Sequence, residues 1–199
     1  VKIRATAATV SAVISGILLG VGALPRPPTG ATASFLTSDT TTKGNCKGTY
    51  GSEGYSLVAD ATQNPAYVAP SSNGSQYIWN PRTSDVRGLQ KAAGTDRIAA
   101  TWYAQQSFTL DLNFTDQNAH QVAIYCVDWD AYPRSQTVDI LDANNHVLDT
   151  RSMPRCVRGP YLVCTVGGPG KIRAPAATAR AGASAPSARV CPPPPRPPG

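Results

Sequence analysis

The chain has 199 residues and a formal net charge of +6, but this charge is unevenly distributed. Residues 34–170 contain all 12 Asp and Glu and ten of the 18 Lys and Arg, so this part carries −2 and the two ends together carry +8. A nucleic-acid-binding protein concentrates Lys and Arg on its folded part, with aromatic residues among them. The composition therefore argues against a nucleic-acid partner and predicts one folded domain with basic extensions.

The two ends of the chain share a short sequence. Val1–Ala5 reads VKIRA, and Gly170–Ala174 reads GKIRA. After the first copy, the apolar run Ser11–Gly20 is typical of a buried strand, whereas the apolar pattern is lost after the second copy. A shared segment at a fixed place in a unit is typical of tandem repeats. We therefore expect residues 1–22 to be a terminal strand segment that echoes the end of a preceding repeat.

A secretory signal peptide is the alternative interpretation of the same stretch. Lys2 and Arg4 precede an apolar stretch from Val10 to Leu24, and Ala31–Ala33 has the small residues of a cleavage site. The apolar stretch is shorter than the roughly 20 residues of a membrane-spanning helix, so we expect no membrane span. Both interpretations lead to export.

A Pro-rich linker over residues 23–33 precedes a stretch dominated by strand patterns. Ser107–Phe114 alternates apolar and polar residues with period two, as half-buried strands do. The later predicted strands are Gln121–Val127, Gln136–Leu141, one that begins with His146–Asp149, and Tyr161–Val166. The turn residues Asp142–Asn145 join the middle two into a hairpin. The one helix candidate is Asp85–Lys91, and Ala69–Gly74 is expected to be a surface loop.

These patterns predict an all-β protein, with residues 34–174 forming an antiparallel β-sandwich of the jelly-roll kind. The tail that follows, residues 175–199, consists almost entirely of Ala, Arg, Gly, Pro and Ser. Such a segment buries too little apolar surface to offset its ordering entropy, so it is predicted to be disordered or polyproline-like. We hypothesise that the reading frame is lost soon after Ala174; a polyproline ligand for a partner domain is the alternative.

The cysteine pattern gives no metal signature. The five cysteines are Cys46, Cys126, Cys156, Cys164 and Cys191, and no two of them form a CxxC pair. Cys126 lies in an apolar run, where a free thiol behaves as a small hydrophobic side chain. If the protein is exported, a disulfide between Cys156 and Cys164 across a hairpin is the pairing that we consider.

Several short segments combine Gly, aromatic and charged residues in a distinctive way. They are Gly48–Tyr55, Trp79, Thr83–Gln90, Asp96–Tyr103, His120–Tyr125, Asp128–Asp130 and Arg134–Gln136. With them, residues 34 to about 173 resemble a galactose-binding-like β-sandwich module of bacterial secreted or surface multidomain proteins, often found beside Ig-like or fibronectin-like domains. Cys46 and Cys164 stand where related sequences have an aromatic residue, so the resemblance implies that neither is a required disulfide partner.

The resemblance also implies a last strand similar to Ala12–Leu19, and no such sequence follows Ala174. The predicted sandwich then has an open edge, and unpaired sheet edges are normally covered. We expect residues 11–20 to fold back into this place, so that deleting residues 1–22 lowers the melting temperature.

The densest polar cluster consists of Asp128, Trp129, Asp130, Tyr132 and Arg134. An Arg and two carboxylates beside two aromatic rings are suited to a sugar, because rings stack on apolar sugar faces and charged groups bind hydroxyls. The structural alternative is that Arg134 pairs with Asp130 and orders the loop. The two carboxylates also leave open a Ca²⁺ site with loop carbonyls, and a glycosidase pair if the strand persists through them.

For the other aromatic residues, the neighbouring sequence predicts whether the ring is buried in the core or exposed. Trp102 is expected in the core, whereas Tyr50, Tyr55 and Tyr67, which lie in loops, are expected to expose their rings.

Taken together, the sequence predicts a non-catalytic binding or adhesion module, extracellular or on a bacterial cell surface, that belongs to a repetitive protein. Its expected partners are a glycan or cell-surface polysaccharide and the neighbouring modules of the same polypeptide, with no cofactor. A structural spacer between other modules is the alternative, and a fragment of a glycoside hydrolase is the third interpretation.

Overall fold

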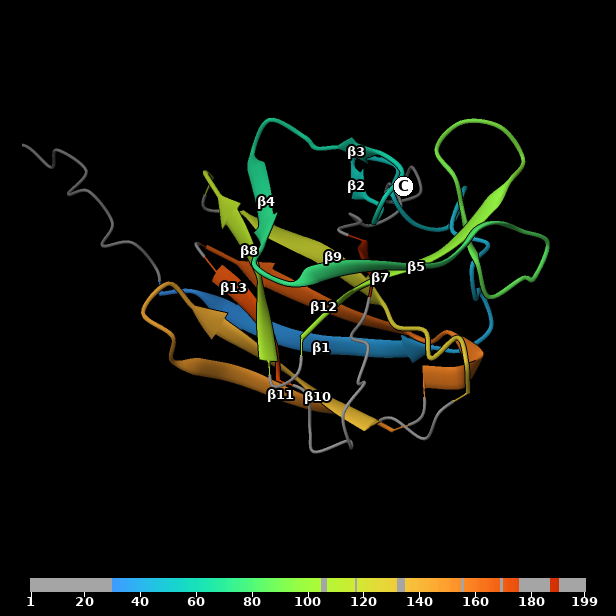
Figure 1. Ribbon diagram of the computed structural model, residues 1–199. Coiled ribbons are helices and arrows are strands. Elements are labelled where there is room, and N and C mark those ends of the chain that lie inside the picture. Colours follow the sequence, from blue (N-terminus) through green and yellow to red (C-terminus); the bar gives the residue numbers. More distant parts are fainter. Residues whose placement is uncertain are drawn as a thin grey trace, which may run out of the picture.

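A computed structural model describes residues 30–104, 107–116, 118–131, 135–154, 156–168, 170–175 and 187–189 (Figure 1). Within this part the protein is all-β, and its strands pair in antiparallel fashion. The predicted terminal segment 1–22 and most of the predicted linker lie outside the described residues. Among the described residues, no helix has the length and apolar character needed to cross a bilayer.

Two sheets form the body of a β-sandwich. The first has the strand order β1 (Thr32–Asp39), β12 (Tyr161–Gly167), β9 (Ala119–Tyr125) and β14 (Ser187–Arg189). The second has the order β11 (Val147–Pro154), β10 (Ser135–Asp142), β13 (Gly170–Pro175), β8 (Ser107–Phe114) and β4 (Val68–Ser72). Strand β13, although late in the sequence, thus lies at the centre of the second sheet.

Smaller elements extend from the sandwich (Figure 1). A three-stranded sheet has the order β5 (Ser75–Thr83), β7 (Arg97–Tyr103) and β6 (Leu89–Gln90). A two-stranded ribbon joins β2 (Tyr55–Ser56) to β3 (Thr62–Gln63), and a short 3-10 helix, η1 (Cys156–Arg158), connects β11 to β12.

The main core lies between the two large sheets and follows the period-two pattern of the sequence. On β8 every second residue is buried, namely Phe108, Leu110, Leu112 and Phe114, which confirms the predicted strand. From the other sheet, Val122 and Ile124 of β9 contribute to the same core. Fully burying one such side chain stabilises the fold by about 1.5–3 kcal/mol, so this face fixes the register of both sheets.

A second apolar cluster covers the outer face of β9 and β12. The alternate residues Ala123 and Tyr125 of β9 and Tyr161 and Val163 of β12 point to this side. They pack under Cys46, Leu57 and Leu89, which come from the stretch between β1 and β7, Leu89 from β6 itself. Both faces of β9 are buried, which explains why the predicted strand Gln121–Val127 is a nearly continuous apolar run.

The predicted strands and the hairpin between β10 and β11 are confirmed, but two local predictions are wrong. Instead of a helix over Asp85–Lys91 there is a turn, closed by the Gly88 amide donating to the Asp85 carbonyl at 2.9 Å, and then β6. Instead of a loop over Ala69–Gly74 there is the strand β4. Pro70 fits there because β4 is an edge strand, which needs no amide donor on its open side.

Two boundaries differ from those expected. Strand β1 begins at Thr32, inside the predicted linker, because Thr32–Asp39 pairs along β12. In the tail for which disorder was predicted, β14 pairs with Ala123–Tyr125 of β9. Strand β14 therefore forms the edge of the first sheet beside β9, and residues 11–20, which were expected to fill an open edge, lie outside the described part.

One disulfide joins Cys126 to Cys156, with a Cα–Cα distance of 5.6 Å. The predictions of a free Cys126 and of a Cys156–Cys164 pairing are therefore wrong. Cys164 is directed into the core from β12, opposite Val122 of β9, while Cys126 follows the end of β9 beside η1. Cys46 and Cys164 are buried free thiols, in line with what the resemblance implied.

Candidate functional site

The predicted cluster begins in a turn that follows β9. The Asp128 amide donates to the Cys156 carbonyl at 3.0 Å, and the Ala131 amide donates to the Asp128 carbonyl at 3.3 Å. Ala131 has a φ of 53°, as expected for the end of a tight turn. Strand β9 ends at Tyr125, so the extended strand that would direct Asp128 and Asp130 to one face is absent from this described segment.

The turn places the first three predicted site residues in different environments. Asp128 is only 2 % exposed, Trp129 is half-buried, and Asp130 is exposed. Tyr132 and Arg134 lie outside the described residues, so the structure places only Asp128, Trp129 and Asp130 of the predicted cluster.

Trp129 is engaged by Arg87 rather than open to a ligand. The Arg87 Cζ lies 4.7 Å from the centroid of the Trp129 ring, and Nη1 donates to the Trp129 carbonyl at 3.3 Å. Arg87 is held in turn by Asp85, with Nη2 2.8 Å from Oδ2. The hydrogen bond from Arg87 lowers the pKa of Asp85, and the same bond raises the pKa of Arg87. Through these contacts Arg87 holds Trp129 against the outer apolar cluster, as the structural alternative for these residues predicts.

The exposed tyrosines expected from the sequence are also packed. The Tyr50 hydroxyl donates to Asp39 Oδ2 at 2.9 Å, and its ring lies 4.5 Å from that of Tyr161. Tyr67 stacks on His120 with a centroid distance of 4.1 Å. The rings of Tyr50 and Tyr67 are half-buried, as is Tyr55, so the expectation of open rings was wrong.

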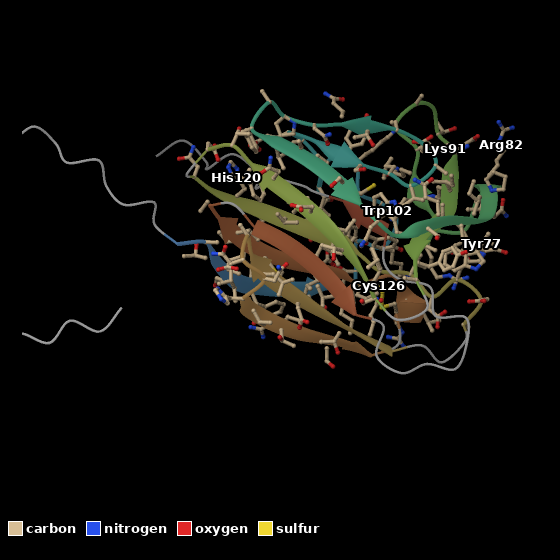
Figure 2. The ribbon with its side chains drawn as sticks, turned by 60° about the vertical axis from the view of Figure 1, so that its left-hand side comes forward. Tyr77, Arg82, Lys91, Trp102, His120 and Cys126 are labelled. Carbon is tan, nitrogen blue, oxygen red and sulfur yellow. A yellow bond between two sulfur atoms is a disulfide. The ribbon has the colours of Figure 1, made fainter. Side chains whose placement is uncertain are left out.

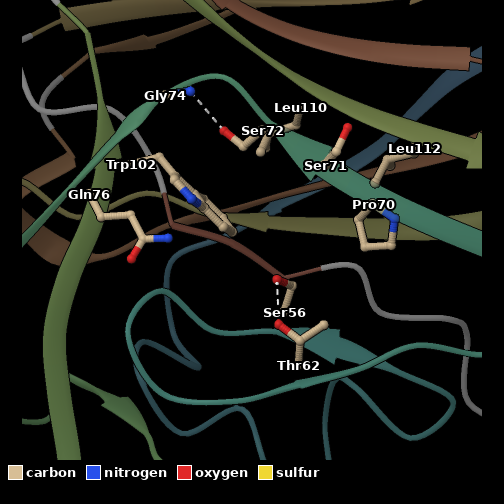
Figure 3. A pocket seen from close by; sticks show the side chains of 10 residues that line it. All are labelled: Ser56, Thr62, Pro70, Ser71, Ser72, Gly74, Gln76, Trp102, Leu110 and Leu112. Carbon is tan, nitrogen blue, oxygen red and sulfur yellow. Dashed lines mark hydrogen bonds between the residues drawn. The ribbon is translucent and has the colours of Figure 1, made fainter.

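A small cavity with a different lining lies beside β4 and β5 (Figure 3). Its volume is about 230 Å³, and its described lining residues supply apolar, hydroxyl and amide groups but no charged side chain. The lining residues are Ser56, Thr62, Pro70, Ser71, Ser72, Gly74, Gln76, Trp102, Leu110 and Leu112. They come from six strands and the β4–β5 turn, which meet where the small ribbon approaches the second sheet.

Trp102 forms the aromatic wall of this cavity. It belongs to the main core, as expected, and keeps 8 % of its surface exposed. Figures 2 and 3 show its indole inside the molecule, with the Gln76 side chain beside it at the cavity. Gly74 lets the chain pass close by, since a Cβ there would lie 2.9 Å from Phe108 Cδ2 and 3.2 Å from Trp102 Cβ.

Polar groups at the cavity are fixed by short contacts. The Ser56 and Thr62 hydroxyl oxygens lie 3.1 Å apart, and the Ser72 hydroxyl accepts from the Gly74 amide at 3.1 Å. Each hydroxyl can both donate and accept, and the exposed Gln76 amide adds two donors and one acceptor. Such a lining suits a small neutral ligand that carries several hydroxyls and an apolar face.

Sequence reasoning assigned Trp102 correctly to the core but did not find this cavity. Its polar residues are isolated Ser, Thr and Gln side chains on strands far apart in the chain, and no spacing pattern links them. The Pro- and Ser-rich stretch 69–74 was the one local signal, and it predicted a loop.

No group of three or more His, Cys, Asp or Glu side chains within the described ranges is arranged to hold a metal ion. The comparisons add no family, since no protein-family model, no curated protein and no solved structure matches the chain.

Proposed function

We propose that the protein is a non-catalytic extracellular binding module and that it holds one neutral sugar residue in the Trp102 cavity. The observation that carries this proposal is the lining itself: an indole wall beside hydroxyl and amide groups, with no charged side chain. Pockets for drug-sized ligands measure about 300–1,000 Å³. The cavity of about 230 Å³ is smaller, so it suits the end of a glycan chain rather than an oligosaccharide.

The disulfide supports the extracellular part of the proposal. Disulfides form and persist in oxidising compartments and are rare in the cytosol of most organisms. The bond between Cys126 and Cys156 closes over 30 positions of sequence and secures the turn at the end of β9. A glycan of a cell surface, or an extracellular polysaccharide, is the partner that this location would offer.

A binding screen of the full chain on a glycan array, with Gln76→Ala as the site variant, tests the proposal. Gln63→Ala is the matched control, because Gln63 is also exposed and does not line the cavity. Loss of one hydrogen bond to a neutral ligand weakens binding about 3- to 10-fold. We expect that effect for Gln76→Ala and none for Gln63→Ala; a glycan bound equally by both variants contradicts the site.

A structural spacer between neighbouring modules is the second candidate function. The observation that favours it is the contact in which Arg87 covers Trp129, because a ring so engaged offers little surface to a ligand. A folded chain that binds no glycan on the array would support the spacer.

A further inference from the structure

The open edge of the sandwich opposite the Trp102 cavity contains a larger groove. Strands β1 and β11 are the outermost strands of their respective sheets at this edge, and β11 and β4 lie at opposite edges of the second sheet. A groove of about 540 Å³ lies between β1 and β11 and reaches the residues after η1. Figure 1 shows these two strands side by side, away from β4.

Two guanidinium groups line the groove, and none of its described lining residues is acidic. Arg151 comes from β11 and Arg158 from the end of η1. Hydroxyl groups of Ser38, Thr40 and Ser152 line it as well, and Phe35 contributes an aromatic ring. Because the lining is cationic here, its chemistry differs from that of the neutral Trp102 cavity.

Arg151 is held in place by its neighbours. Its Cζ lies 4.3 Å from the centroid of the Phe35 ring, and its Nε lies 2.9 Å from Asp149 Oδ2. These contacts use one face and the Nε of the guanidinium, and among the described residues the two terminal nitrogens make no hydrogen bond, so they are the atoms that would bind an anion. A guanidinium that is already ordered loses little entropy when it binds a carboxylate through two parallel hydrogen bonds.

Arg158 supplies the second positive charge. Its side chain is exposed, and among the described residues no ion pair with a carboxylate is found for it. Residues 34–170 as a whole carry a net charge of −2, so a polyanion is not attracted to the folded part in general. A polyanionic ligand is therefore attracted only where positively charged side chains lie close together, as Arg151 and Arg158 do in this groove.

We propose that this groove binds an acidic oligosaccharide built from carboxylated sugars such as uronic acids. The two arginines take the carboxylates, and the Ser and Thr hydroxyls bind ring hydroxyls. The volume lies within the range of about 300–1,000 Å³ that is typical of ligand sites, and it exceeds the Trp102 cavity enough for a short run of sugars. The proposal does not depend on a ligand in the Trp102 cavity.

Calorimetric titration of the full chain with trigalacturonate at low salt tests the proposal, with neutral galactotriose as the matched probe. We expect trigalacturonate to bind at least tenfold more tightly than galactotriose. Arg158→Gln is the primary variant, because the Arg158 side chain is exposed and makes no ion pair among the described residues; Arg151→Gln is the second. Each is expected to weaken trigalacturonate binding at least tenfold, since hydrogen bonds to charged groups are the strong ones.

Arg82→Gln is the charge-matched control. Arg82 lies on β5, pairs with Asp96 and projects outward at the end of the molecule near Tyr77 (Figure 2). This variant and Gln76→Ala should bind trigalacturonate as the parent chain does, which separates this groove from the Trp102 cavity. The proposal is overturned if trigalacturonate does not bind, if galactotriose binds equally well, or if Arg158→Gln binds trigalacturonate with unchanged affinity. It is also overturned if a sulfated trisaccharide or phosphatidylserine vesicles bind more tightly than trigalacturonate.

Discussion

Reduction of the disulfide between Cys126 and Cys156 should lower stability by a calculable amount. The two residues are 30 positions apart, and closing a loop of that length removes entropy from the unfolded chain. The chain-entropy relation gives about 3.6 kcal/mol at 25 °C. For a domain of this size each kcal/mol corresponds to about 2–4 °C, so the melting temperature should fall by about 7–15 °C.

The assay is thermal unfolding followed by circular dichroism, with and without a phosphine reductant. Reducing the parent chain avoids the cavities that two Cys→Ala substitutions would add to the core. The double variant Cys46→Ala/Cys164→Ala removes only the buried free thiols, so it should keep the full response to reductant. The double variant Cys126→Ala/Cys156→Ala should show no response. A parent chain whose melting temperature is unchanged by complete reduction would refute the reasoning.

Two further predictions concern titration and backbone strain. Burial alone would raise the pKa of Asp39, but hydrogen bonds from residues 41–42 outweigh this effect and hold the pKa well below its ordinary value. As the pH falls, the Asp39 carboxylate is therefore protonated in the unfolded chain before it is protonated in the folded one. Stability should therefore decrease below about pH 4, and Asp39→Asn should show a smaller decrease in urea midpoint between pH 7 and pH 3; an equal decrease contradicts this. Gly159→Ala should lower the melting temperature much more than Gly94→Ala does. Both glycines have φ above +70°, but only at Gly159 would a Cβ lie 1.9 Å from the Tyr125 hydroxyl. An equal decrease in melting temperature for the two variants would contradict this, because it would mean that Tyr125 moves aside at no cost.

The sequence predicted the strands wherever alternation reports burial directly. Ser107–Phe114 was found with its bounds intact because one face of β8 is apolar and the other is polar. Strand β4 was missed because its pairing with β8 comes from the backbone, while its own residues, Pro and Ser among them, carry turn signals. Such an edge strand is defined by its partner rather than by its own pattern.

The candidate sites were harder to predict for a related reason. Asp128 and Trp129 were predicted to belong to a sugar-binding cluster because of their residue types, but Trp129 packs against Arg87 in the structure. Neither the Trp102 cavity nor the Arg151 groove has a local motif, since each is assembled from strands that meet only in the folded state. The disulfide was missed for the same cause: spacing along the chain does not show which Cβ atoms face each other.

The central place of β13 affects how the protein is made. Gly170–Pro175 lies between β10 and β8, so until these residues are synthesised the second sheet consists of two halves with facing open edges. At about 5–20 residues per second, a ribosome exposes β8 for several seconds before β13 can close the gap. Unpaired edges of that kind are templates for aggregation. A nascent chain halted before residue 170 should therefore need chaperones to remain soluble. Once β13 has been synthesised, this one strand pairs with both β10 and β8 and joins the two halves of the sheet.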